Sequence, residues 1–199
     1  MTSGNEVVRV LRAADRPAAV WKNGGGVTRE IAAWPEGAGM SDFAWRVSLA
    51  EVAADGPFSA FPGVDRTLTL AEGSGMDLAV AGVHRVVDER YAPQDFPGDR
   101  PTDCRLLHGP VVNFNVMYRR DATEADTAVV RGALAVTVPP GETLLVVALE
   151  GPAVLDRTGG PDSPVQLAPH DAALATGGLT CRVRTPGRAA VVTFRPRPR

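Results

Sequence analysis

Short stretches in which apolar and polar residues alternate follow one another along the whole chain. Residues 43–50 are the clearest case, with an apolar face opposed to a face that carries Arg46 and Ser48. Residues 111–118 alternate in the same way. The pattern predicts further strands at residues 6–12, 27–34, 66–71, 76–81, 83–87, 127–138, 143–149, 152–156, 165–167, 172–175, 179–185 and 189–194.

Turn-forming residues separate these runs. The chain has 21 Gly and 17 Pro among 199 residues, and such a high content of turn-forming residues disfavours long helices. No segment keeps a 3.6-residue period for more than a couple of turns. We therefore predict an all-β chain with strands at the spacing of sandwiches, jelly rolls or barrels.

A charged stretch at residues 119–126, which is poor in apolar side chains, is the best candidate for a boundary. It predicts an N-terminal half, residues 1–120, that carries a pocket, and a C-terminal half, residues 121–199. A chain of this length, with 44% hydrophobic residues, can bury a sizeable core.

Polar side chains on the inner faces of the first half are the first candidates for chemistry. If these strands close into a small barrel, one lumen receives Thr28, Glu30, Arg46, Ser48, Asn113 and Asn115. Arg46 could then clamp a carboxylate bidentately. The alternative is an ordinary ion pair between Arg46 and Glu30 on an outer face of the sheet.

Residues 21–31 concentrate an aromatic, a cation, an amide, three glycines and a carboxylate. Lys22 is the one lysine among 21 basic residues, which suggests a site that needs a compact ammonium, although a single lysine must also stand somewhere. Lys22 and Asn23 are placed at the rim of the lumen. The glycines fit neither a P-loop nor a dinucleotide motif, and a plain turn is the alternative.

The sequence shows no motif typical of a metal site or of a catalytic nucleophile. His84, His108 and His170 form no H-x-H pair, so no metal site is expected unless the three converge in space. No G-x-S-x-G motif is present. Cys104 and Cys181 stand far apart, outside any C-x-x-C pair, and are expected to be reduced thiols in the core or at the surface.

The charge of the chain excludes some partners. Its formal net charge is -2, with no basic stripe interleaved with aromatic residues, so nucleic-acid binding is not expected. The first residues lack the pattern of a secretory signal, and no apolar run is long enough to span a bilayer. A soluble cytoplasmic protein without membrane partners is expected.

Several motifs together resemble one known family. They occur in the order Trp21-Lys22-Asn23-Gly24-Gly25-Gly26, Thr28, Glu30-Ile31, Trp45-Arg46-Val47-Ser48, Gly56-Pro57-Phe58-Ser59, Phe61-Pro62-Gly63-Val64-Asp65-Arg66, Phe96-Pro97-Gly98-Asp99 and Asn115-Val116-Met117. Their joint occurrence over about residues 7–120 resembles the HutD/Ves family.

This resemblance implies a cupin-type fold of two β-barrel halves, a bicupin, without metal-binding histidines and without a cofactor. It also implies a regulatory, metal-independent binding protein of histidine utilisation, with urocanate, formylglutamate or formiminoglutamate as the carboxylate ligand. The candidate ligand-binding residues are Lys22, Asn23, Thr28, Glu30, Arg46, Ser48, Arg66, Asn113 and Asn115. A second copy of the chain, as a homodimer, is the remaining candidate partner.

Two alternatives stay open at this point. The chain could be an enzyme that acts on such a metabolite, with Glu30 or Lys22 as acid or base, or a structural protein without a ligand. The chain also departs from the family at Asn113, where the family usually has Asp. An amide there removes a charge and adds hydrogen-bond donors.

Overall fold

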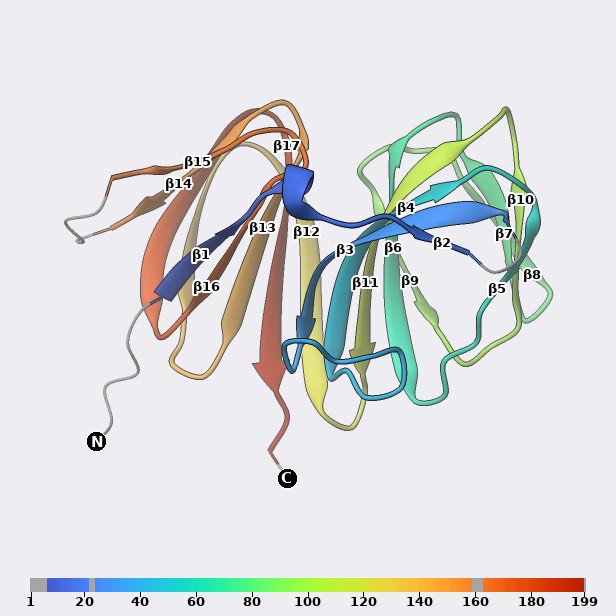
Figure 1. The fold of residues 1–199 in the computed structure, drawn as a ribbon, viewed down its shortest axis with the longest axis horizontal. Helices are drawn as coiled ribbons and strands as arrows, with labels where there is room; N and C mark the ends of the chain where they lie inside the picture. Colours follow the sequence, from blue (N-terminus) through green and yellow to red (C-terminus); the bar gives the residue numbers. More distant parts are fainter. Residues whose placement is uncertain (1–6, 22–23, 159–162, 199) are drawn as a thin grey trace. The chain divides into compact units, whose positions relative to one another are not determined.

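The computed structural model of the protein describes residues 7–21, 24–158 and 163–198. In these residues the chain consists of β-strands and one short 3-10 helix, η1 (Ala13–Asp15). The prediction of an all-β chain is confirmed (Figure 1). Within the described ranges no helix has the length and apolar character needed to cross a membrane.

The chain divides into two compact units. The N-terminal unit comprises residues 16–123, and the C-terminal unit comprises residues 1–15 and 124–199. The division after residue 123 falls inside the charged stretch that was predicted as a boundary. Residues 1–15 differ from the expected division at 1–120, because their strand pairs with the last part of the chain.

The N-terminal unit contains a six-stranded sheet and a four-stranded sheet. In the larger sheet the order is β2 (Ala19–Val20), β3 (Gly26–Trp34), β4 (Trp45–Val52), β11 (Val111–Arg119), β6 (Val64–Glu72) and β9 (Pro93–Pro97). In the smaller sheet it is β5 (Gly56–Phe58), β10 (Thr102–Leu106), β7 (Met76–Val80) and β8 (Val83–Val87).

An apolar core joins the two sheets of the N-terminal unit. Leu68 and Leu70 of β6 pack in one cluster with Met76 and Leu78 of β7 and with Cys104 of β10. The period of two along each strand directs these side chains to a common interior. Polar side chains of β4 and β11 lie outside this cluster.

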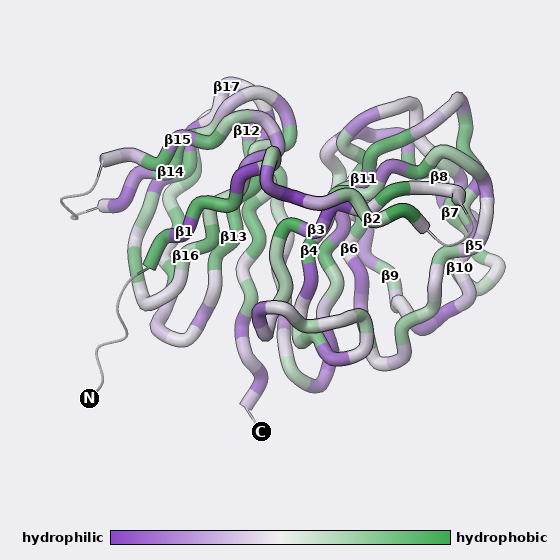
Figure 2. Tube along the Cα trace, viewed as in Figure 1, coloured by the Kyte–Doolittle hydropathy of each residue, from purple (hydrophilic) through white to green (hydrophobic). Residues whose placement is uncertain are grey.

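The C-terminal unit is one seven-stranded sheet. The order is β1 (Val7–Leu11), β16 (Ala172–Thr176), β13 (Thr143–Glu150), β17 (Leu179–Pro196), β14 (Ala153–Arg157) and β15 (Val165–Leu167), with β12 (Thr123–Val138) also paired to β17. Figure 2 shows β1 and β13 as largely hydrophobic. In this unit Leu144, Val146 and Leu155 belong to the buried core.

Several elements differ from the sequence-based expectation. The strands predicted at 179–185 and 189–194 form the single strand β17. The segment between the strands predicted at 43–50 and 66–71 contains β5, which was not predicted and pairs with β10. Pairing with a neighbour overrides local turn propensity, and a sequence read one segment at a time does not contain that information.

Both cysteines are free and buried. Cys104 lies in the core of the N-terminal unit and Cys181 in that of the C-terminal unit. Burial raises the pKa of each thiol to about 11. Both thiols are therefore protonated at neutral pH, which agrees with the expectation of reduced core thiols.

A buried carboxylate fixes the first strand to the C-terminal unit. Asp171, which is 5% exposed, accepts hydrogen bonds from the Ala13 N–H at 2.7 Å, Arg12 Nη1 at 2.7 Å and the Ala168 N–H at 3.2 Å. Burial raises the pKa of Asp171, but these donors outweigh it and hold the pKa below its ordinary value. The ionised form is thus the one that the fold stabilises.

Replacing Asp171 by Ala is expected to lower the free energy of unfolding by about 1–3 kcal/mol at neutral pH, because three hydrogen-bond donors lose a charged acceptor. A carboxyl whose folded pKa is lowered stabilises the fold above the ordinary Asp pKa of about 3.9. That contribution is lost as the pH falls through the lower folded pKa, so wild type and D171A should converge in acid. Urea denaturation at several pH values measures this difference.

The matched control is Asp126→Ala. Asp126 pairs with Arg195 at 2.6 Å, but its side chain is 66% exposed, so the change should cost no more than about 1 kcal/mol. An equal loss in both variants, or a D171A defect that does not depend on pH, would contradict the role given to Asp171.

Candidate functional site

A cavity of about 740 Å³ lies in the N-terminal unit, lined by residues of β2, β3, β4, β5, β6 and β11. Small-molecule pockets in proteins measure roughly 300–1,000 Å³. The polar side chains on its wall include Thr28, Arg46, Ser48, Arg66, Asn113 and Asn115. Six of the nine residues predicted as ligand-binding from the sequence therefore line one space.

The register of the larger sheet brings these side chains together. Met117 on β11 pairs with Arg46 of β4 on one side and Arg66 of β6 on the other. Asn115 pairs with Ser48 in the same way. Directly opposed residues of antiparallel strands share a face, so alternate positions of β4 and β11 line the cavity together with Arg66 of β6.

Arg66 is the buried cation of this cavity. It is 9% exposed, and its Nη2 donates a hydrogen bond to Asn115 Oδ1 at 3.3 Å. Its Cζ lies 5.0 Å from the ring centroid of Phe58 and 5.2 Å from that of Phe96. Among the residues that the structure describes, no group accepts from Nε and no carboxylate pairs with the guanidinium.

This arrangement leaves a positive charge without a counter-charge from the described residues. Burial lowers the pKa of Arg66 to about 10, so the group is still protonated at neutral pH. Removing a charge from water costs free energy unless a partner of opposite charge is supplied. The geometry thus suits an anion that enters the cavity, and a carboxylate matches the guanidinium fork.

Arg46 pairs with Met117 from the other side of β11, opposite Arg66, but its charge has a different environment. Its Nε donates to Glu30 Oε2 at 2.5 Å and its Nη1 to Met40 Sδ at 2.8 Å. The predicted alternative of an ion pair with Glu30 is therefore present, although it lies at the cavity wall. With its charge already compensated, Arg46 is less suited than Arg66 to clamp a ligand carboxylate.

Glu30 does not line the cavity, in contrast to the prediction. Its side chain is 40% exposed. In the sheet Glu30 pairs directly with Ser48, before the β-bulge between Glu30 and Ala32, and its carboxylate accepts a hydrogen bond from Arg46 at the cavity wall. The other two predicted residues, Lys22 and Asn23, lie outside the described residues.

An apolar wall faces the polar residues. Trp21 and Phe58 make an edge-to-face contact with ring centroids 6.4 Å apart, and both line the cavity with Met117. Trp21 Nε1 donates to Thr28 Oγ1 at 2.8 Å, which fixes the indole. Sequence reasoning assigned no role to these apolar residues, because strand periodicity marks them only as core.

The glycine stretch supports the same wall. A Cβ atom on Gly26 would lie 2.4 Å from the backbone oxygen of Glu51 and 3.1 Å from the Trp21 ring. Gly24 has φ of +71°, and a Cβ atom on it would have no described atom within 4 Å. Gly26 is thus required for close packing, whereas Gly24 is required only for its backbone conformation.

The histidines do not converge on a metal site. Within the described ranges no group of three or more His, Cys, Asp or Glu side chains is placed to hold a metal ion. His84 Nδ1 instead lies 2.8 Å from Asp77 Oδ2 on the surface.

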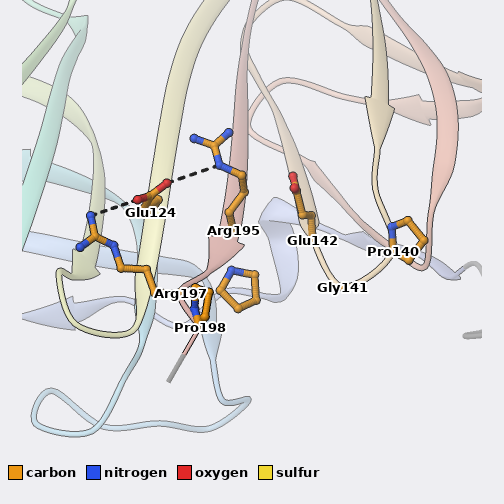
Figure 3. Close-up of a pocket in the computed structure, with 8 residues that line it drawn as sticks. Glu124, Pro140, Gly141, Glu142, Arg195, Arg197 and Pro198 are labelled. Atoms are coloured by element: carbon orange, nitrogen blue, oxygen red, sulfur yellow. Dashed lines mark ion pairs between the residues drawn. The ribbon is translucent and has the colours of Figure 1, made fainter.

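Another pocket, of about 400 Å³, lies in the C-terminal unit and is lined by charged and proline side chains (Figure 3). Glu124 pairs there with Arg195 at 3.7 Å and with Arg197 at 3.1 Å. Because its arginines are already paired and exposed, this pocket has no uncompensated charge comparable to that of Arg66.

Comparison with known proteins assigns the chain to a family. A family model described as HutD matches residues 13–193. The chain belongs to the HutD family. The match covers the whole N-terminal unit and extends through most of β17, so the resemblance found in the sequence motifs is confirmed.

Relatives in the HutD family support this assignment. The protein Ves of Cronobacter sakazakii is 39% identical over 114 residues, which are 57% of this chain and 61% of that protein. The chain spans about three fifths of the length of the curated relatives that it matches.

Solved structures show the same fold. HutD from Pseudomonas fluorescens, in a formate condition, has a TM-score of 0.83 and 32% identity, covering 96% of this chain and 100% of that one. A conserved protein of unknown function from Pseudomonas aeruginosa has a TM-score of 0.87 and 33% identity, covering 95% and 99%. The bacterial pirin of Escherichia coli is 10% identical with a TM-score of 0.63, covering 96% and 99%.

The pirin likeness shows the fold alone. Together these structures identify the architecture as cupin-like, as the resemblance implied. The division into two barrel halves stays a prediction.

Replacing Gly26 by Ala is expected to lower the free energy of unfolding by about 1–3 kcal/mol, because the new methyl group meets backbone that cannot move away. Gly24→Ala is the control from the same turn, and its cost should be limited to about 1 kcal/mol for the left-handed conformation. Thermal denaturation compares the two. Equal melting temperatures for both variants would contradict the packing role of Gly26.

Proposed function

We propose that this HutD-family protein binds a small carboxylate metabolite without a metal ion and that Arg66 receives the carboxylate. The observation that carries the proposal is the buried guanidinium of Arg66, which pairs with no carboxylate among the described residues. A ligand carboxylate would supply the missing charge through charge-assisted hydrogen bonds. The cavity volume fits a molecule of this size.

The family narrows the ligand class. The HutD family is associated with histidine utilisation, and one relative is encoded in the 3′ region of hutC in Pseudomonas putida. Urocanate, formylglutamate and formiminoglutamate are acids of this pathway, and each can place a carboxylate at Arg66. Formate, the condition of the related HutD structure, is itself a carboxylate. We propose one of these three acids as the ligand.

The proposal includes a regulatory role in the cytoplasm. A protein that holds a pathway intermediate at one uncompensated charge can sense its concentration, and the bound and free forms differ by the loss of a buried unpaired cation. This role predicts that the ligand is recovered unchanged after incubation with the protein. Turnover of any of the three acids, followed by proton NMR, would contradict a purely binding role.

The test is calorimetry of the purified protein with each acid and of the Arg66→Met variant. At least one acid should bind at millimolar concentration or below, and R66M should weaken that binding about 10-fold or more, because a charged hydrogen bond is lost. Arg85→Met is the control, since Arg85 lies outside the cavity and contacts Gln94. No binding by any acid at millimolar concentration would overturn the proposal.

The same variant makes a second prediction about stability. R66M should unfold at a temperature equal to or above that of the unliganded wild type, because an apolar side chain of similar length replaces a buried unpaired charge. Differential scanning calorimetry without ligand measures this. A large drop in melting temperature for R66M, with none for R85M, would show that Arg66 is needed for the fold itself.

A further inference from the structure

Asn113 carries an unused hydrogen-bond acceptor in the wall of the cavity. The residue is fully buried and lines the cavity from β11. Its Oδ1 has no hydrogen-bond partner among the described residues. A buried amide oxygen without a donor is rare in folded proteins and calls for an explanation, of which a bound partner is one.

The orientation of the amide follows from its neighbour. Asn113 Nδ2 lies 4.0 Å from Met76 Sδ. A thioether sulfur accepts hydrogen bonds and cannot donate them, so the NH2 end of the amide belongs on this side. The oxygen is therefore the end that lacks a partner.

The described protein groups around this oxygen do not supply a donor. Asn115 Nδ2 donates to the backbone oxygen of Asn113 at 3.4 Å, not to its side chain. On the neighbouring strands Asn113 pairs with Ala50 and Leu70, which have no polar side-chain atoms. Thr28, which pairs with the other side of Ala50, accepts the Trp21 indole N–H, and its hydroxyl makes no hydrogen bond to Asn113 Oδ1.

We propose that Asn113 Oδ1 accepts a hydrogen bond from the same ligand whose carboxylate lies at Arg66, an inference that rests on the proposed function. The ligand is then a carboxylic acid that also carries an N–H donor. Arg66 reaches Asn115, and Asn113 is the next residue on that face of β11. Asn115, which Arg66 reaches, and Asn113 are about 6–7 Å apart along β11, the repeat of two residues along a strand.

Two pairs of acids test this inference. trans-Urocanate is compared with trans-3-(furan-3-yl)acrylate, which keeps the planar acid but has no N–H. N-formylglutamate is compared with its ester analogue 2-(formyloxy)glutarate, in which oxygen replaces the N–H. For the pair that binds, wild type should prefer the N–H acid about 10-fold or more, because the ester or furan leaves Oδ1 unpaired.

The variant Asn113→Leu removes the acceptor at similar volume, and the preference should fall to about 1-fold while binding still depends on Arg66. Asn113→Asp is the second variant, because it keeps an acceptor oxygen. It should retain the preference even if its charge weakens both members of a pair, and it serves if N113L does not fold.

The outcomes separate this inference from the proposed function. Equal affinity of wild type for both members of a pair, with binding lost in R66M, overturns the role of Asn113 and leaves the carboxylate site standing. A preference that persists in N113L also overturns it. If none of the four acids binds, and formiminoglutamate does not bind either, the proposed function fails and the inference fails with it.

Discussion

The register between β4, β11 and β6 is the constraint on which the cavity depends. Each strand alternates its side chains, and the pairing of Met117 with Arg46 and with Arg66 is continued in the same register as far as Asn113. A slip by one residue would turn the polar set away from the cavity and the apolar set into it. The backbone hydrogen bonds that pair these strands therefore also determine which side chains line the cavity.

The two arginines that pair with Met117 illustrate how surroundings decide a role. Arg46 is neutralised by Glu30 at 2.5 Å, whereas Arg66 sits between two aromatic rings with an amide as its polar partner. The charges of the Arg46–Glu30 pair compensate each other, whereas the buried single charge of Arg66 costs free energy that the rest of the fold has to offset. The dense apolar cores of both units provide that stability, as expected where function conflicts with local stability.

Alternation along single strands predicted a large part of the candidate site. It placed Arg46 with Ser48 and Asn113 with Asn115 on shared faces, as the structure has them. It also placed Glu30 on this face, where Glu30 pairs with Ser48 and binds Arg46 without itself lining the cavity. It could not rank Arg66 above Arg46, since that ranking depends on which charges meet after folding. The pairing of β1 with β16 was equally invisible, because the partners are more than 150 residues apart in the sequence.

The most direct test of the carboxylate site follows the guanidinium of Arg66 itself. Side-chain nitrogen NMR of the wild-type protein, titrated with urocanate, formylglutamate and formiminoglutamate in turn, reports on each arginine separately. We expect one of these acids to shift the Arg66 Nε resonance in a saturable manner and to shift that of Arg46 less. A saturable response at Arg46 with none at Arg66 would contradict the assignment of Arg66 as the carboxylate receptor.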